Sequence, residues 1–113
     1  MGVTRLVELD RQGAFEWCRA FTESHQENFS VVSWLLPSDL RPHFCSVYSF
    51  CRMTDDLGDE AEGDRLALLD RWEAALRACF EGARSEPVFI ALGATIDQFE
   101  LPPGPFLRLI EAN

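Results

Sequence analysis

The chain has 113 residues, of which 47% are hydrophobic, including nine Phe and three Trp, and its formal net charge is −9 at pH 7. This apolar content suits one small folded domain and excludes a disordered tail. The negative charge repels phosphate backbones, so we expect no nucleic-acid partner.

The hydrophobic pattern is helical through nearly the whole chain and predicts an all-α fold of about five helices. A short amphipathic segment over residues 15–21 precedes His25. Side chains at steps of three and four then predict one helix from about Asp39 to about Asp59. Pro42 falls in the first turn of this helix, where a missing N–H costs little. Between the two, "VVSW" is too short to indicate a strand.

The second half of the chain predicts three more helices. Asp64 could cap a helix that stops at Gly82. Its apolar face is formed by Leu69, Trp72, Leu76, Cys79 and Phe80. Pro87 can open the next helix, which runs to about Phe99 before the turn "LPPG". The segment "PFLRLIEAN" then begins a helix of only about two turns, which we interpret as interrupted.

The cysteines show no C-x-x-C pair and no zinc-ligand spacing, no secretory signal is present, and no apolar run approaches the ~20 residues of a membrane span. These features indicate four buried, reduced thiols in a cytosolic protein, namely Cys18, Cys45, Cys51 and Cys79.

The stretch "FCRMTDDLGDE", residues 50–60, gathers acids at the end of an apolar helix. Asp55 and Asp59 are four residues apart and therefore share one helical face, with Tyr48 and Arg52 on the same stripe. Like charges at this spacing repel each other, and the helix dipole disfavours anions near the C-terminus. Two local rules are broken together, which is typical of a functional site.

A divalent cation would resolve this conflict. Mg²⁺ is usually held by one or two carboxylates together with substrate phosphates, and the Arg52 guanidinium offers a fork for a phosphate oxygen. The alternative is a solvated acidic helix end with no ligand. An EF-hand is excluded because the D-x-D-x-D-G spacing is absent.

Residues 25–60 resemble the first conserved block of the squalene/phytoene synthase family, whose members join two prenyl diphosphates head to head inside an all-helical bundle. The motif is a His, an L-P turn and Y-x-x-C-R-x-x-D-D-x-x-D. Its positions are matched by His25, Phe29, Leu36, Pro37, Tyr48, Cys51, Arg52, Asp55, Asp56 and Asp59. The strings "ENF" and "SWLLP" are most similar to the bacterial hopanoid-pathway branch, hydroxysqualene synthase. Gln26, where Tyr is common, and Gly58, where Ala is common, depart from the pattern.

The resemblance implies metal ligands on the acidic stretch. Asp55 and Asp59 would ligate Mg²⁺ bound to a substrate diphosphate. Asp56 and Glu60 would support that metal from an outer shell.

The resemblance also implies substrate contacts. Arg52 and Tyr48 would contact the diphosphate, His25 would lie near the phosphates, and Phe29, with Val32 and Phe44, would line the prenyl tunnel. Each role has a structural alternative: a salt bridge from Arg52 to Asp56, packing for Tyr48 and the tunnel residues, and helix capping for His25. His43 matches no motif position and is interpreted as structural.

The family implies a longer protein than this chain. Its members are more than twice as long and carry a second D-x-x-x-D on a later helix, whereas residues 60–113 contain no second such pair. We therefore expect residues 1–113 to be the N-terminal portion of a synthase domain, inactive alone and dependent on the missing C-terminal region as its partner. Without the helices that would close the cavity, the apolar faces around Phe44, Trp72 and Phe89 would be partly exposed. The whole enzyme would ionise presqualene or farnesyl diphosphate with Mg²⁺, in the cytoplasm or peripheral to a membrane. The alternative is a non-catalytic acidic helical protein that binds a partner or a cation.

Overall fold

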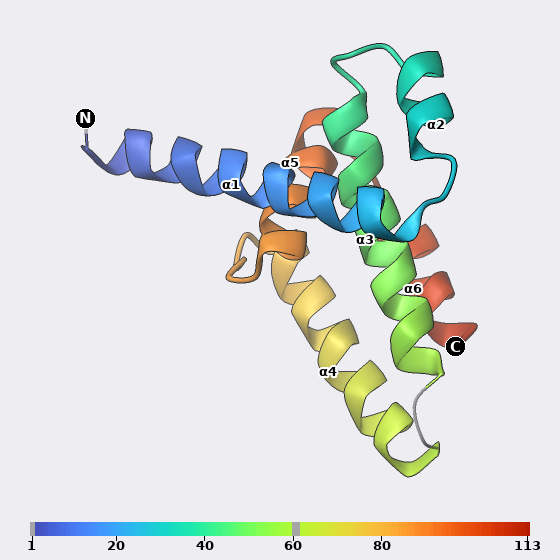
Figure 1. Cartoon of the computed structure of the whole chain (residues 1–113). Helices are drawn as coiled ribbons and strands as arrows, with labels where there is room; N and C mark the ends of the chain where they lie inside the picture. The colour runs from blue at the N-terminus through green and yellow to red at the C-terminus, as the bar shows by residue number, and fades with distance from the viewer. Residues whose placement is uncertain (1, 60–61) are drawn as a thin grey trace.

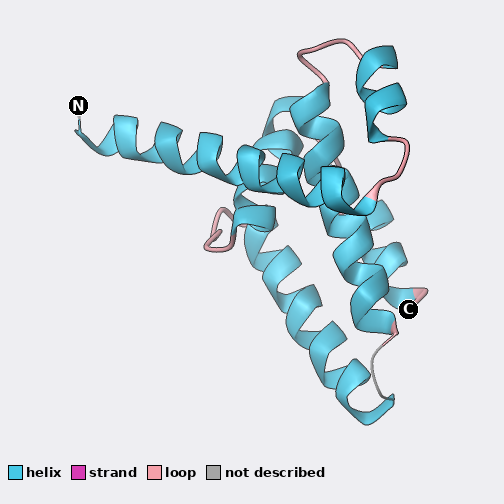
Figure 2. Cartoon of the chain, in the orientation of Figure 1, coloured by secondary structure: helices cyan, strands magenta, loops and turns pink. Residues whose placement is uncertain are grey.

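The structure is a computed structural model that describes the backbone of residues 2–59 and 62–113, and the side chains of residues 10–59 and 63–113. The described residues form six helices, one after another (Figure 2). They are α1 (Gly2–His25), α2 (Phe29–Leu35), α3 (Arg41–Gly58), α4 (Glu62–Phe80), α5 (Pro87–Phe99) and α6 (Gly104–Glu111). No strand occurs in the described residues, so the all-α prediction is confirmed.

Helix α3 is at the centre of the arrangement and contacts four of the other helices, α1, α4, α5 and α6. Helix α1 crosses both α3 and α5, and α4 and α6 lie along the other end of α3 (Figure 1). Helix α2 lies at the edge of the bundle, near the start of α3 (Figure 1). The acidic stretch lies at the end of α3 that is flanked by α4 and α6.

The main hydrophobic core is built from aromatic rings contributed by α3, α4, α5 and α6. The Phe50 ring lies 5.7 Å from the ring of Trp72 and 5.6 Å from that of Phe106, and the Trp72 and Phe89 rings are 4.8 Å apart. Trp72 is 8% exposed and Phe89 2%. The expectation that their faces would be exposed is therefore wrong, because α6 forms and covers this core with Phe106. Phe44 is half-buried, as expected.

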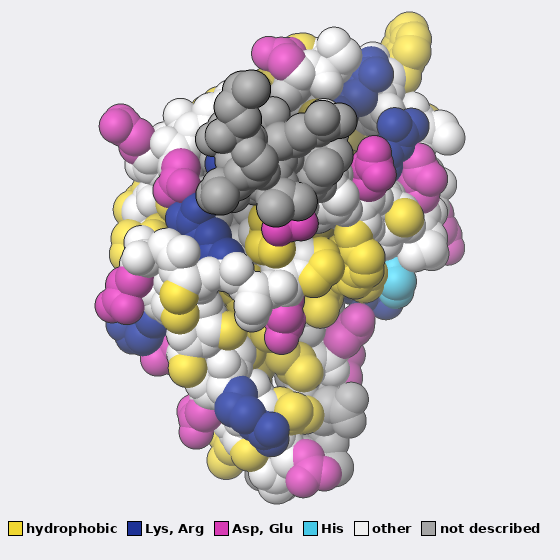
Figure 3. All heavy atoms as spheres, turned by 90° about the vertical axis from the view of Figure 1, so that its left-hand side faces the viewer, with side chains coloured by type: hydrophobic (Ala, Val, Ile, Leu, Met, Phe, Trp, Pro, Cys, Tyr) yellow, Lys and Arg dark blue, Asp and Glu magenta, His cyan; other side chains and the backbone are white. Residues whose placement is uncertain are grey.

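Helix α2 is the element that the sequence did not predict. It has seven residues, none of them buried. Its outward face carries Val31, Trp34 and Leu35, and the Trp34 side chain is 81% exposed. Figure 3 shows the side of the molecule that lies at the left in Figure 1. Hydrophobic side chains are exposed there among acidic and basic ones.

Local glycine and proline residues mark where α4 ends and α5 begins. Helix α4 begins at Glu62, so Asp64 lies inside the helix and is not its cap, contrary to the prediction. The chain leaves α4 at Gly82, whose φ of 96° suits glycine, and the Ala83 N–H bonds to the Ala78 carbonyl. Helix α5 runs from Pro87 to Phe99 as predicted, with proline in its first turn.

A guanidinium clamp fixes the connection between α4 and α5. Arg84 donates two hydrogen bonds to the Asp97 carboxylate, at 2.8 and 3.1 Å, and a third to the Cys79 carbonyl at 2.9 Å. The Arg84 guanidinium lowers the pKa of Asp97. It passes directly over Gly93, where an added Cβ would overlap its atoms. Glycine is therefore required at this position by close approach.

His43 has the structural role expected of it. Its Nδ1 lies 2.8 Å from the Thr95 hydroxyl, and its ring meets the rings of Phe15 and Phe99 edge to face. Burial lowers the pKa of His43, although Asp39 and Gln98 act in the opposite direction. The ring therefore joins α1, α3 and α5 in its neutral form.

The thiols agree with the sequence prediction in part. All four cysteines are unpaired by disulfides, and three of them, Cys18, Cys45 and Cys79, are buried, whereas Cys51 is only half-buried. Burial raises the pKa of the Cys18 thiol to about 11. This thiol is therefore protonated at neutral pH and behaves as a small apolar group.

Candidate functional site

Helix α3 continues without a break into the acidic stretch. It begins at Arg41, two residues after the predicted start, and ends at Gly58. Asp59 caps it with helical dihedral angles, φ −87° and ψ −4°, and its N–H bonds to the Asp55 carbonyl at 3.2 Å. Asp55 and Asp59 are therefore separated by one helical turn, and both are exposed. Glu60, the predicted outer-shell acid, lies outside the described residues.

Arg52 and Asp56, one turn apart on α3, form an ion pair. The distance between Arg52 Nε and Asp56 Oδ1 is 3.2 Å, and the side chains are 42% and 50% exposed. The Asp56 carboxylate is the main cause that raises the pKa of Arg52, and Tyr48 adds to it. The predicted alternative for Arg52 is thus present. Such an exposed pair is weak because water screens it, so a stronger anion could displace Asp56 from Arg52.

Tyr48 lies one turn before Arg52 on the same helix. Its side chain is half-buried and its ring stacks on that of Phe44, with 6.1 Å between centroids. Packing therefore holds the ring of Tyr48. Tyr48, Arg52 and the aspartates together occupy successive turns of one helix.

His25 ends α1 and is held by neighbours on its own helix. Its Nδ1 lies 2.9 Å from the Phe21 carbonyl and 2.8 Å from the Ser24 hydroxyl, and its ring stacks on Phe21 at 4.1 Å. These contacts are those of the capping alternative. The ring remains exposed.

Phe29 begins α2 and is not grouped with the acids. It packs against a small cluster of buried residues that includes Cys18 and Cys45. Cys45 precedes Asp55 by ten residues on α3, which corresponds to about 15 Å along the axis. Phe29 therefore lies near the opposite end of α3 from the acidic stretch.

The last turn of α3, residues 55–59, is called the acidic turn below. Two contacts that support it were not predicted from the sequence. The Trp72 indole of α4 donates a 2.8 Å hydrogen bond to the Thr54 hydroxyl, which itself donates to the Phe50 carbonyl at 2.7 Å. Thr54 directly precedes Asp55. At the end of the helix, a Cβ on Gly58 would lie 2.5 Å from Oδ1 of Asn113. Glycine at position 58 thus leaves room for the Asn113 side chain, which follows α6.

A magnesium ion fits the donors of this turn only in part. Within residues 10–59 and 63–113, no three His, Cys, Asp or Glu side chains come together as a metal site. Two exposed carboxylates one turn apart are nevertheless the hard oxygen ligands that Mg²⁺ uses alongside water and phosphate. The turn could therefore supply one side of a metal site, with the remaining ligands from elsewhere.

Comparison with known proteins places this geometry in a family. The family model described as squalene/phytoene synthase matches residues 22–113. The chain belongs to the squalene/phytoene synthase family. It is 35% identical over 102 residues to phytoene synthase from Arthrospira platensis and 29% identical over 110 residues to phytoene synthase 1 from Zea mays. These matches cover 88% and 93% of the chain, but 33% and 27% of the relatives.

A solved structure resembles the chain more strongly. The crystal structure of squalene synthase HpnC from Alicyclobacillus acidocaldarius superposes with a TM-score of 0.86 at 58% identity. The match covers 93% of this chain and 40% of that one. The helical fold is therefore that of the synthase family. The described helices include none long and apolar enough to cross a membrane.

Proposed function

We propose that residues 1–113 are the N-terminal portion of a synthase that ionises a prenyl diphosphate with the help of Mg²⁺. The observation that carries this proposal is the continuous helix α3, which keeps the exposed carboxylates of Asp55 and Asp59 one turn apart beside Arg52. Membership of the family supports it. The lengths support it as well, because the chain spans about a third of the length of the curated relatives.

In this proposal the acidic turn is the metal-holding side of the site. Asp55 and Asp59 bind Mg²⁺, which when bound supplies positive charge against the diphosphate of the substrate. Asp56 is assigned to Arg52 rather than to the metal, because the two form an ion pair. It therefore acts in the outer shell.

The remaining side chains act on the leaving group and on the hydrocarbon. Arg52 exchanges Asp56 for a diphosphate oxygen and so stabilises the charge that develops as the C–O bond breaks. Tyr48, held against Phe44, offers its hydroxyl next to Arg52. His25 approaches the phosphates from the end of α1, and Phe29 contacts the apolar chain. An apolar cavity then limits the access of water to the carbocation.

The branch of the family is proposed from the degree of similarity. The chain is 58% identical to a squalene synthase and 35% identical to a phytoene synthase. We therefore assign the squalene-type branch, with presqualene or farnesyl diphosphate as substrate and a squalene or hydroxysqualene product.

The test is pyrophosphate release by residues 1–113 combined with the remainder of the synthase, either in one polypeptide or as a separate chain. We expect Mg²⁺-dependent turnover of farnesyl or presqualene diphosphate by the combination and none by residues 1–113 alone. Asp55→Asn and Asp59→Asn should each lower the rate by about two to three orders of magnitude. Asp70→Asn, on the exposed surface of α4, is the matched control and should leave the rate unchanged.

Two results would contradict the proposal. Full activity of Asp55→Asn would show that the acidic turn does not hold the metal. A combined protein that binds Mg²⁺ but releases no pyrophosphate from either substrate would favour the non-catalytic alternative.

A further inference from the structure

The outward face of α2 carries a group of exposed hydrophobic side chains that the proposed site does not use. Val31, Trp34 and Leu35 lie at steps of three and four along the helix and are 56%, 81% and 67% exposed. Among the residues whose side chains are described, no other helix carries more than one exposed large hydrophobic side chain. These three side chains are called the α2 patch below.

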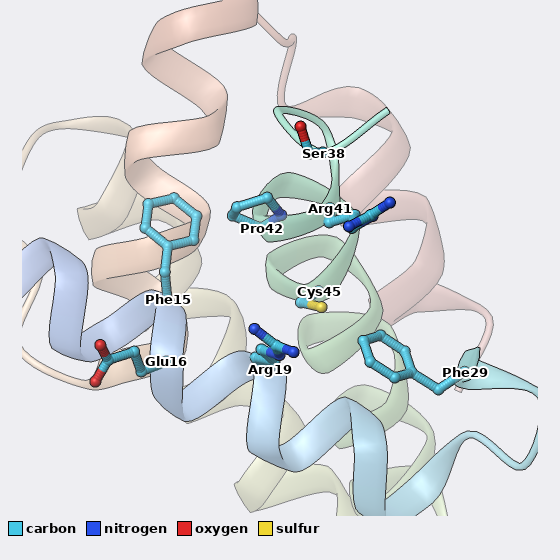
Figure 4. A pocket seen from close by; sticks show the side chains of 8 residues that line it. All are labelled: Phe15, Glu16, Arg19, Phe29, Ser38, Arg41, Pro42 and Cys45. Atoms are coloured by element: carbon cyan, nitrogen blue, oxygen red, sulfur yellow. The ribbon is translucent and has the colours of Figure 1, made fainter. Parts of the chain in front are cut away.

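The opposite face of α2 already has its packing partners. Phe29 packs against the cluster that contains Cys18 and Cys45. Its ring points from α2 toward Cys45, in a pocket of about 210 Å³ that α1 and α3 also line (Figure 4). Val32 and Leu36 are half-buried. Helix α2 is therefore the outer wall of this pocket, and the α2 patch faces away from the bundle.

The charges near the α2 patch decide what kind of surface it fits. Residues 29–38 contain no charged side chain. The nearest charged residues along the chain are two acids, Glu27 and Asp39, and one base, Arg41, whose Nε is held by the Leu36 carbonyl at 3.3 Å. The net charge of the chain is −9. The segment therefore lacks the basic cluster that attracts proteins to anionic lipids, and its surroundings favour a neutral surface.

The size of the α2 patch argues against a protein partner. Three side chains of this kind bury about a few hundred Å², whereas a stable protein–protein interface buries roughly 1,200 Å² or more. A lipid interface has no such requirement. Tryptophan is enriched there because its ring is apolar and its N–H is polar.

From these observations we infer that the α2 patch docks on a lipid bilayer with zwitterionic headgroups. Trp34 lies among the headgroups, and Val31 and Leu35 reach the start of the acyl chains. The choice of a bilayer rests on the proposed function, because a squalene or hydroxysqualene product carries no charge and leaves water for an apolar phase. The helix that holds Phe29 against the substrate hydrocarbon then contacts, on its other face, the phase that receives the product.

The test is co-sedimentation with sucrose-loaded phosphatidylcholine vesicles, using residues 1–113 alone and joined to the remainder of the synthase. We expect both proteins to bind, and bromines in the acyl chains to quench the emission of Trp34. Trp34→Ser and Leu35→Ser should each weaken binding about tenfold, without a change in the urea midpoint. Trp34→Phe should keep most of the binding and lose most of the quenching. Leu66→Ser is the matched control, because Leu66 is 61% exposed on α4, and should have no effect.

Anionic lipid tests the choice of headgroup. Because the chain is strongly acidic, phosphatidylserine mixed into the vesicles should weaken binding severalfold at low salt. Added salt should restore the binding, since it screens the repulsion between like charges.

The inference is overturned if neither protein binds the vesicles, if Trp34→Ser binds as tightly as the unchanged protein, or if phosphatidylserine strengthens binding. Binding that is lost when residues 1–113 are joined to the remainder would also overturn it, because the remainder would then cover the α2 patch. No turnover is measured in these experiments. Intact vesicle binding together with a failed pyrophosphate assay would therefore refute the proposed function and leave the docking surface in place.

Discussion

The hydrogen bond from Trp72 to Thr54 gives a sharp test of how the acidic turn is supported. Thr54 is fully buried, and its hydroxyl is the acceptor of the Trp72 indole N–H at 2.8 Å. Thr54→Val keeps the shape of the side chain but removes that acceptor. The indole N–H is then buried without a partner, which costs about 1–3 kcal/mol. We expect Thr54→Val to lower the free energy of unfolding by about 2 kcal/mol.

A second buried threonine provides the matched control. Thr22 is also fully buried and donates to the carbonyl of Cys18, four residues earlier, at 2.7 Å. It differs in what its loss leaves behind, because the Cys18 carbonyl still accepts from the Ser49 hydroxyl at 3.3 Å. Thr22→Val should therefore cost less than about 1 kcal/mol.

The assay is urea unfolding followed by circular dichroism, with thermal unfolding beside it. For a domain of this size, a loss of about 2 kcal/mol corresponds to a fall in Tm of about 8 °C. Equal costs for Thr54→Val and Thr22→Val would refute the reasoning, because only Thr54 accepts an indole proton. Thr54→Ser should keep the hydrogen bond and lose only the buried methyl group, about 1 kcal/mol.

Three further predictions concern the frame of the molecule. Gly93→Ala should cost about 2 kcal/mol in urea unfolding, since its Cβ displaces Arg84 from Asp97; an Arg84–Asp97 contact that survives in the variant's crystal structure would contradict this. Gly82→Ala should cost about 1 kcal/mol because φ is 96° there, and an unchanged unfolding midpoint would argue against that backbone. The pKa of His43 is lowered in the fold, so the unfolded chain takes up the proton first as the pH falls. Its contribution to stability is therefore complete above about pH 6.5 and decreases below it. His43→Gln should flatten that part of the urea-midpoint profile from pH 7.5 to 5.5, and an unaltered slope would exclude His43 as its source.

The sequence predicted best the helices whose first and last residues carry local start and stop signals, such as proline and turn residues. Helix α5 begins at Pro87 and ends at Phe99 as expected, because proline opens it and "LPPG" follows. Helix α3 was predicted to within two residues at its start and one at its end. Helix α2 was missed because seven residues with no buried side chain leave no period to detect.

The burial of the aromatic core could not be predicted for a different reason. The sequence shows that Trp72 and Phe89 are apolar, but it does not show which element covers them. Helix α6 was interpreted as an interrupted fragment, yet its Phe106 lies 5.6 Å from Phe50 and completes the cluster. Tertiary contact between elements far apart in the chain decided the outcome.

In the candidate site too, local spacing could be predicted from the sequence, whereas contacts between helices could not. Spacing alone placed Asp55 and Asp59 one turn apart and offered Asp56 as a partner for Arg52, and both relations are present. The indole of Trp72 beneath this turn and the approach of Asn113 to Gly58 depend on packing between helices. No pattern within residues 50–60 could have indicated them.

The three tryptophans occupy such different surroundings that the chain carries its own set of optical reporters. Trp34 on α2 is 81% exposed, Trp17 on α1 is 39% exposed, and Trp72 in the aromatic core is 8% exposed. An aqueous quencher such as iodide should therefore extinguish the emission of Trp34 first and that of Trp72 last. The emission of Trp72 should also lie furthest to the blue. Detachment of α2, partial opening of α1 and loss of the core could then be followed separately in one unlabelled sample.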